Sequence, residues 1–203
     1  KARRDRPELY PLAALHLLAL ASSNRGSVYT DKFNLITLGI ASTGAGKENP
    51  QDVIKALARE AWLSEKVSAE PGSFRDMIYA LIEGDGTNLY TVDELHSLLQ
   101  AMKGKNANSY ESKIEAEILK MTTTGLYTFR PMEKRQVIPN LKRDLKDVEK
   151  QLEDMSEEDA LTERGLMLIR TRDKLTRHID YIEHGWPNPF CSIMGHSVPE
   201  RLD

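Results

Sequence analysis

The chain has 203 residues, of which 40% are hydrophobic and 29% charged, and its net charge at pH 7 is −3. This length and hydrophobic content suffice for one globular domain with an appended subdomain. The charge balance offers no overall basic surface, so a nucleic-acid partner would have to bind a local patch. The single cysteine, Cys191, excludes an internal disulfide and a thiolate metal cluster, and it favours a reducing compartment. We therefore expect a cytoplasmic protein.

The first predicted element is a helix rich in leucine and alanine over residues 9–21. Its apolar run over residues 12–21 is too short to span a bilayer and contains His16. The arginines before it imitate a signal peptide, but no Ala-x-Ala cleavage site follows. We expect a buried helix and no membrane partner. Because the sequence begins with Lys1 and stops at Asp203 as a further element starts, we also expect a piece of a longer protein.

A compact, apolar and β-prone run over residues 33–41 predicts a buried strand of the parallel type. A glycine-containing loop follows. Pro50 then stands where the first turn of a helix favours proline, and apolar residues recur at helical spacing up to Trp62. Strand, glycine loop and helix follow one another in the order that a phosphate-binding loop requires.

The next segment alternates between helices and a second strand. Ser73 is a candidate N-cap for a helix that ends before Gly84. Residues 88–92 form a short β-prone run that delivers Asp93-Glu94 at its carboxyl end. Two further helices are predicted, one from Leu95 to Met102 and one over residues 114–121.

Residues 132–184 predict an antiparallel αα-hairpin that resembles a coiled coil, with a bend near Ser156. The apolar residues at four- and three-residue or heptad spacing are Val137, Leu141, Leu145, Val148 and Leu152, then Leu161, Leu168, Leu175 and Ile182. Basic side chains on these arms alternate with acidic ones. A solvated or oligomer-forming coiled coil and an arm that touches DNA both remain open.

After the hairpin, residues 190–195 predict a third buried strand with His196-Ser197 at its carboxyl edge. The pattern as a whole predicts an α/β fold of the P-loop NTPase type, in which helices flank a parallel sheet. In this organisation residues 1–131 form the first part of the ATPase core, residues 132–184 are the inserted hairpin, and residues 185–203 complete the core.

The candidate phosphate-binding loop carries the predicted nucleotide chemistry. Its glycines permit a tight wrap around phosphates, and Lys47 is the phosphate cation and one of two predicted catalytic residues. The predicted nucleotide-binding residues are Ser42, Thr43, Gly44, Ala45, Gly46, Lys47, Glu48 and Asn49. Ala41 replaces the first glycine of the usual pattern, and Glu48 replaces its Ser or Thr. An ordinary strand-to-helix turn is the alternative interpretation.

Asp93 and Glu94 are the candidate acids of the hydrolytic site. A strand that ends in Asp-Glu can hold Mg²⁺ through the first acid and polarise the attacking water through the second. We expect Asp93 to be the metal-side acid and Glu94 the catalytic base. The alternative is that both merely open the following helix, where acids are favoured. Glu48 is a further candidate metal ligand, although beside a triphosphate it would also repel the phosphates.

His196 and Ser197 are candidate γ-phosphate sensors, because a third strand could place a side chain between the other two strand ends. A polar strand end without a sensor role is the alternative. The remaining histidines predict no metal site. His16 lies on an apolar helix face, and His178 and His184 lie on the charged hairpin without ligand spacing.

Three parts of the sequence together resemble domain-of-unknown-function family 3987: residues 41–50, the strand into Asp93-Glu94, and residues 188–195 with residues 199–202, which include Arg201. The resemblance covers most of residues 9–120 and 186–203, and in that family an acid after the loop lysine is familiar. It implies a helicase-like ATPase of phage, prophage or plasmid replication, with a RecA-like or AAA+-like fold and with ATP and Mg²⁺ as cofactors. It also implies single-stranded DNA, a primase or another replication protein, and further copies of the chain in a ring as partners.

Three functions remain open at this point. One is an ATP-driven helicase-like motor. The second is a nucleotide-gated assembly module in which ATP changes the oligomeric state without translocation. The third is a scaffold whose loop no longer binds nucleotide because Glu48 repels the phosphates.

Overall fold

The computed structural model describes residues 7–23, 33–42, 46, 49–103 and 111–199. The helices, including two short 3-10 turns, are η1 (Pro7–Leu9), α1 (Tyr10–Ser22), α2 (Asn49–Glu60), η3 (Ser64–Lys66), α3 (Phe74–Glu83), α4 (Leu95–Lys103), α5 (Glu111–Thr123), α6 (Pro131–Glu153), α7 (Glu157–Ala160) and α8 (Glu163–His184). The strands are β1 (Ile36–Ile40), β2 (Val67–Ser68), β3 (Thr87–Val92), β4 (Leu126–Tyr127), β5 (Trp186–Pro187) and β6 (Phe190–Ser197).

Several helices begin where the sequence places a capping side chain. Ser73 is the N-cap of α3, and its hydroxyl accepts a hydrogen bond from the Asp76 amide at 3.2 Å. Ser156 caps α7 and Thr162 caps α8 in the same way. Such caps satisfy amides that have no partner inside the helix. The predicted starts of the helices after Ser73 and Ser156 are therefore confirmed.

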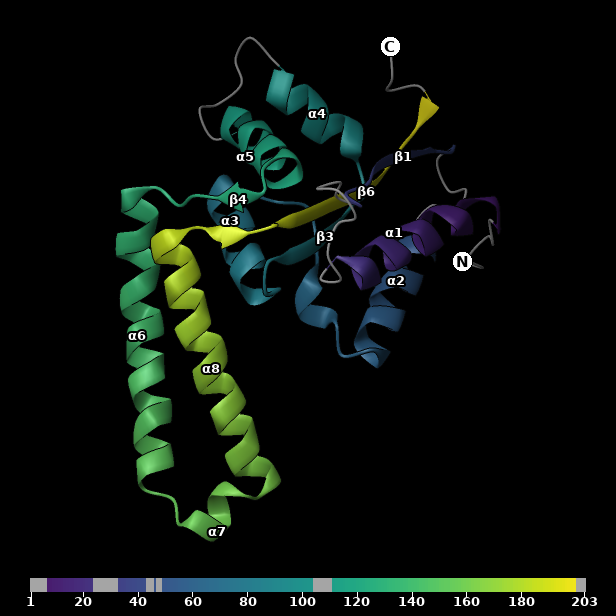
Figure 1. The fold of residues 1–203 in the computed structure, drawn as a ribbon. Coiled ribbons are helices and arrows are strands. Elements are labelled where there is room, and N and C mark those ends of the chain that lie inside the picture. The colour runs from purple at the N-terminus through teal and green to yellow at the C-terminus, as the bar shows by residue number, and fades with distance from the viewer. Residues whose placement is uncertain (1–6, 24–32, 43–45, 47–48, 104–110, 200–203) are drawn as a thin grey trace. The chain divides into compact units, whose positions relative to one another are not determined.

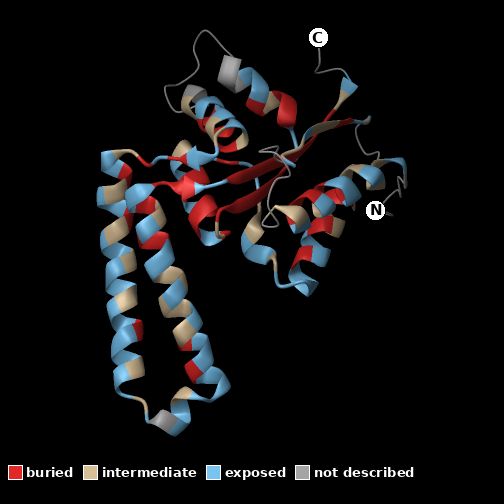
Figure 2. Cartoon of the chain, viewed as in Figure 1, coloured by how far each residue is buried: buried red, intermediate tan, exposed pale blue. Residues whose placement is uncertain are grey.

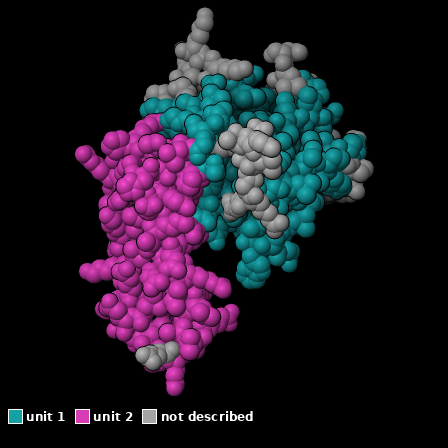
Figure 3. All heavy atoms as spheres, in the orientation of Figure 1, with its two compact units in different colours: residues 1–125, 188–203 teal, residues 126–187 magenta. Residues whose placement is uncertain are grey.

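The chain divides into two compact units, which Figure 3 colours separately. Unit 1 comprises residues 1–125 and 188–203, and unit 2 comprises residues 126–187. Within unit 1, the Asn188 amide donates to the Gly125 carbonyl at 2.7 Å, so the chain leaves and re-enters this unit at one place. The hairpin is thus an insertion between two adjacent points of unit 1.

Unit 1 is built on a four-stranded sheet in the order β1-β6-β3-β2, and every neighbouring pair is parallel (Figure 1). All residues of β3 and β6 are buried, as expected for strands covered on both faces (Figure 2). The predicted α/β architecture with a parallel sheet flanked by helices is confirmed. The strand β2 was not predicted from the sequence.

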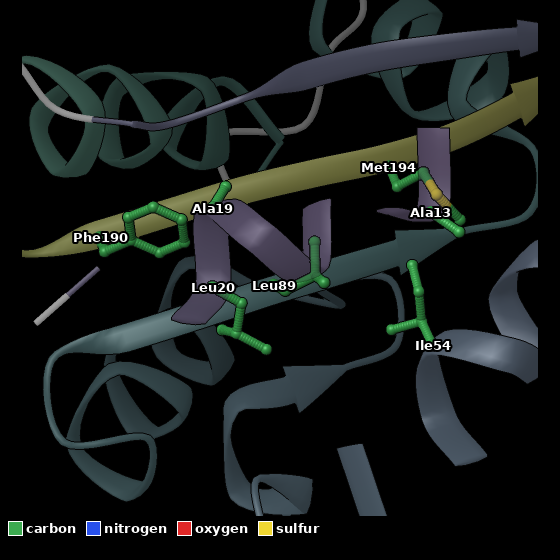
Figure 4. Packing of buried hydrophobic residues seen from close by; sticks show 7 residues of the cluster. All are labelled: Ala13, Ala19, Leu20, Ile54, Leu89, Phe190 and Met194. Carbon is green, nitrogen blue, oxygen red and sulfur yellow. The ribbon is translucent and has the colours of Figure 1, made fainter. Parts of the chain in front are cut away.

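One face of the sheet packs against α1 and α2. Its core cluster, shown in Figure 4, consists of Ala13, Ala19, Leu20, Ile54, Leu89, Phe190 and Met194. The helix predicted over residues 9–21 is thus α1, and its burial against the sheet agrees with the prediction of a core helix. Among the described residues, no helix is long and apolar enough to cross a membrane.

The other face of the sheet is covered by α4 and α5, which both contact β6. Gly195 lets α4 approach closely, because a Cβ atom at this position would overlap the side chain of Leu95. Successive residues of a strand point to opposite faces. Met194 and His196 therefore face α1 and α2, whereas Gly195 and Ser197 face α4.

Unit 2 contains the predicted helical hairpin, with α6 packed against α8 and the short α7 at the turn. The buried apolar residues of the two arms include Val137, Val148, Leu168 and Ile182, all of which the heptad pattern had marked. Leu161 is the exception. It is 80% exposed, because it is the C-cap of α7 and not part of a long helix, so its assignment to the seam was wrong.

The base of the hairpin was not predicted. There β4 and β5 form an antiparallel two-stranded sheet. Trp186 is buried against His178, Tyr181 and Phe129, with ring centroids 4.9, 5.3 and 6.4 Å away. These rings supply a core for unit 2 beyond the 132–184 segment.

Candidate functional site

The carboxyl ends of β1, β6 and β3 meet at one edge of the sheet. The predicted site residues His196 and Ser197 are the last two residues of β6, and the others follow β1 or β3 in the sequence. The Ile40 of β1 pairs with Ser197 of β6, and Val92 of β3 pairs with Gly195. The amide of Ala41 donates to the Ser197 carbonyl at 3.1 Å. The candidate loop therefore starts from a backbone hydrogen bond to the end of β6.

Part of the candidate phosphate-binding loop is described. Ser42 is exposed, and Gly46 has a positive φ of 82°, a conformation that favours glycine. The Asn49 amide donates to the Gly46 carbonyl at 3.1 Å, and α2 begins at Asn49. The positive end of a helix thus follows the loop directly. Five predicted residues of the loop lie outside the described residues: Thr43, Gly44, Ala45, Lys47 and Glu48.

Asp93 and Glu94 are both exposed, directly after β3. The backbone carbonyl of Glu94 accepts hydrogen bonds from Ser97 and Leu98, at 2.9 and 3.4 Å. Glu94 therefore also opens α4, which was the alternative interpretation of the pair. The two roles are compatible, because the helix uses the carbonyl of Glu94 and leaves its carboxylate at the edge of the sheet.

Glu70 is a third carboxylate near this pair, and the sequence did not predict it. It follows β2, the neighbour of β3 in the sheet. Partial burial, and then the negative charges of Glu94 and Asp93, raise the pKa of the Glu70 carboxyl above its ordinary value. Each carboxylate therefore makes this edge a less favourable place for another negative charge.

His196 lies on the α2 side of β6 and is fully buried. Its Nδ1 is 3.0 Å from Nε2 of the Gln51 side chain, and Nε2 of Gln51 also donates to the Val92 carbonyl at 3.1 Å. A Cβ atom at Gly39 would lie 2.6 Å from the His196 ring. Gln51 therefore links the loop helix to β6 and β3, and glycine at position 39 makes room for the histidine.

Ser197 lies on the opposite face and is also fully buried. Its hydroxyl is 3.0 Å from Nδ1 of His96, and Nε2 of His96 is 3.0 Å from the hydroxyl of Ser97. The Ser97 hydroxyl in turn donates to Oε2 of Glu94 at 3.2 Å. A chain of hydrogen bonds thus joins the end of β6 to the carboxylate of the predicted base.

Sequence reasoning missed three members of these networks: Gln51, His96 and Ser97. A signal was present for two of them. Gln51 and His96 are polar residues at buried positions of amphipathic helices, beside Ile54 and Leu95. Buried polar side chains need hydrogen-bond partners. The identity of those partners depends on the strand order, which the sequence alone did not predict.

The exposed carboxylates at this edge are ligands of the kind that Mg²⁺ prefers when it binds together with phosphates. Mg²⁺ prefers carboxylate oxygens and is commonly held by one or two of them together with phosphates and water. Asp93 and Glu94 are exposed carboxylates at the end of β3. Within the described part of the chain, no group of three or more His, Cys, Asp or Glu side chains is placed to hold a metal ion alone.

Comparisons with known proteins add no relative. No family model matches the chain, and neither the curated proteins nor the solved structures contain a match. The resemblance to family 3987 therefore stays a prediction.

Proposed function

We propose that this chain is the ATP-binding and ATP-hydrolysing domain of a helicase-like motor in DNA replication. The observation that carries the proposal is the strand order: β6 lies between the strand before the glycine loop and the strand before Asp93-Glu94. All three strands are parallel, so the loop and the acids emerge at one edge. Open α/β sheets bind their ligands at this kind of edge.

Each residue has a defined role in the proposed reaction. Lys47 and the amides of the loop bind the phosphates, supported by the helix that begins at Asn49. Asp93 holds Mg²⁺, which when bound neutralises developing charge on the phosphates. Glu94 orients the attacking water and accepts its proton. The hydrogen bond from Ser97 to Glu94 supports this role, because it restricts the carboxylate to fewer rotamers.

The first test separates nucleotide binding from hydrolysis. We expect Lys47→Ala to abolish ATP binding in calorimetry, because it removes the phosphate cation. Lys55→Ala removes an exposed lysine of α2 and serves as the matched control. Glu94→Gln should bind ATP and lose hydrolysis by about 10²- to 10⁴-fold, the usual contribution of a general base. Wild-type protein that does not bind ATP would refute the proposal.

The second test concerns the motor and its partners. ATPase activity is measured with and without single-stranded DNA, together with the mass of the protein in solution. A motor predicts faster hydrolysis on DNA. An ATP-dependent change of mass with no effect of DNA would favour the assembly module instead. An unchanged melting temperature at millimolar Mg-ATP would favour the scaffold with a degenerate loop, because a ligand that binds only the native state must raise it.

A further inference from the structure

Two adjacent residues of the central strand connect to opposite sides of the sheet. His196 contacts Gln51 of α2 on one face, and Ser197 contacts His96 of α4 on the other. The first connection reaches the helix that follows the phosphate loop, and the second reaches Glu94 through His96 and Ser97. The end of β6 is therefore bonded to both halves of the candidate site.

The hydrogen bonds on the α4 side have a defined direction. The Ser97 hydroxyl has one proton, which it donates to Glu94. It must then accept from His96, so neutral His96 carries its proton on Nε2. Nδ1 of His96 is left as an acceptor for the Ser197 hydroxyl at 3.0 Å. Each group in this chain donates to the next, from Ser197 to Glu94.

We propose that His96 and Ser97 are positioning residues, which hold the Glu94 carboxylate in register with the end of the central strand. The effect of this positioning on ATP hydrolysis rests on the proposed function. His96 is 4% exposed and Ser197 is fully buried, so water does not readily replace the hydrogen bond between them. A displacement at the end of β6 would thus reach the base through two side chains. This device orients the proton acceptor and does not itself touch the nucleotide.

The Ser197 hydroxyl also has a second acceptor, so the series of hydrogen bonds from Ser197 to Glu94 can be interrupted at this residue. The carbonyl of Val198 lies 3.4 Å from it, whereas His96 lies at 3.0 Å. One hydroxyl proton cannot serve both acceptors fully. A shift of the backbone after β6 toward the Val198 bond would therefore withdraw the donor from His96 and loosen Ser97 and Glu94.

A spectroscopic test addresses the chain directly and needs no ATPase activity. Long-range proton–nitrogen NMR reports which ring nitrogen of His96 carries the proton, and the His96→Gln variant assigns its signals. We expect the Nε2–H tautomer in the wild-type protein near pH 8. Glu94→Ala should let the Ser97 hydroxyl turn toward His96 and add the other tautomer. An Nδ1–H tautomer in the wild type, or no response to Glu94→Ala, would overturn the inference.

A kinetic test addresses the consequence for hydrolysis. Ser97 is only partly buried, so Ser97→Ala should fold normally, and we expect kcat to fall about 10- to 100-fold while ATP affinity stays within about twofold. Ser97→Thr keeps the hydroxyl and should restore the rate. In a Glu94→Gln background Ser97→Ala should have no further effect. Ser64→Ala, at an exposed serine of η3, is the matched control.

The outcomes separate the two hypotheses. If Ser97→Ala hydrolyses ATP as fast as the wild type while Lys47→Ala does not bind ATP, the positioning role is wrong and the proposed function stands. If the wild-type protein neither binds nor hydrolyses ATP, the proposed function and the catalytic consequence both fail. The tautomer of His96 then still decides whether the hydrogen-bonded chain exists.

Discussion

His16 has no part in the candidate site, yet its burial should make the stability of the protein depend on pH. It is fully buried on α1, and its Nε2 is 2.8 Å from the hydroxyl of Thr37 on β1. Desolvation lowers the pKa of His16 from 6.5 to about 4. Between these two pH values, His16 is therefore mostly neutral in the native state and mostly protonated in the unfolded chain.

We expect acid to destabilise the wild-type protein more than the variant His16→Gln. As pH falls from 6.5 toward about 4, the unfolded chain binds a proton that native His16 does not. Because of this difference in proton binding, the free energy of unfolding falls by up to about 1.4 kcal/mol per pH unit. Urea unfolding at several pH values measures the effect. His184→Gln, at an exposed histidine of α8, is the control, and equal pH slopes for the wild type and His16→Gln would contradict the prediction.

Glu70 should have the opposite dependence. Its pKa is raised in the native state, so its contribution to stability is largest below the ordinary value near 4.5 and declines as pH rises through the raised value. We expect Glu70→Gln to be more stable than the wild type at pH 7, by about 0.5 kcal/mol because the group is largely solvated. The difference should vanish below about pH 4, the ordinary range of carboxyl groups. Glu115→Gln, at an exposed carboxylate of α5, is the control for thermal unfolding.

Residue identities at the site were partly predictable. Asp93 and Glu94 were found because they end an apolar run, a pattern visible in the sequence itself. Glu70 was missed because it follows a strand of only two residues, Val67–Ser68. Such a strand has no periodicity, and it forms because β3 offers its free edge. Gln51 and His96 were missed for a similar reason, since their partners His196 and Ser197 lie far away in the sequence.

Among the elements, β1 leaves room for the His196 ring of β6 at Gly39, which is its register partner. A Cβ atom there would stand 2.6 Å from Cδ2 of His196, far closer than atoms in contact. We expect Gly39→Ala to displace the His196 ring and to lower the free energy of unfolding by about 1–3 kcal/mol, as overpacking usually does. Denaturant unfolding measures this change.

The matched control for that variant is Gly125→Ala. A Cβ atom at Gly125 would have its nearest neighbour, Oδ1 of Asn188, 4.0 Å away, which is ordinary contact. Its effect on stability should stay within about 0.5 kcal/mol, as for most surface substitutions. If both alanine variants lose the same free energy of unfolding, the close approach of His196 to position 39 is not the cause of the destabilisation.

The longer elements were predictable and the shortest were not. The strands β1, β3 and β6 and the helices around them follow from apolar runs and helical spacing, as the sequence predicted. β4 and β5 have two residues each, and their formation depends on each other and not on local propensity. Leu161 shows the limit of a heptad pattern: the spacing continued through a residue where the chain turns.

For the whole molecule, the adjacency of Gly125 and Asn188 predicts that unit 1 does not need the hairpin to fold. We expect a variant in which a short Gly-Ser linker replaces residues 126–187 to unfold cooperatively, because the two ends are joined by a hydrogen bond of 2.7 Å. Circular dichroism during thermal unfolding measures this. A linker-containing chain that lacks a cooperative transition would contradict the prediction.

The same variant tests what the hairpin contributes. If the hairpin is an arm for DNA, its removal should abolish stimulation by single-stranded DNA and leave basal hydrolysis unchanged. If it joins copies of the chain, the mass in solution should fall instead. The sequence left these two interpretations open, since its basic and acidic residues alternate along both arms.

The position of β6 also sets an order for events on the ribosome. This strand is central in the sheet, yet of the four described strands of the sheet it is synthesised last, after the whole hairpin. Until it emerges, β1 lacks the one neighbour that it has among the described strands, and β3 has only β2 of its two described neighbours. Through the synthesis of residues 126–187, the nascent chain therefore exposes the edges of β1 and β3 that later pair with β6, a state that is prone to wrong pairing. The hairpin has local contacts, so it can fold before β6 is synthesised and joins the sheet of unit 1.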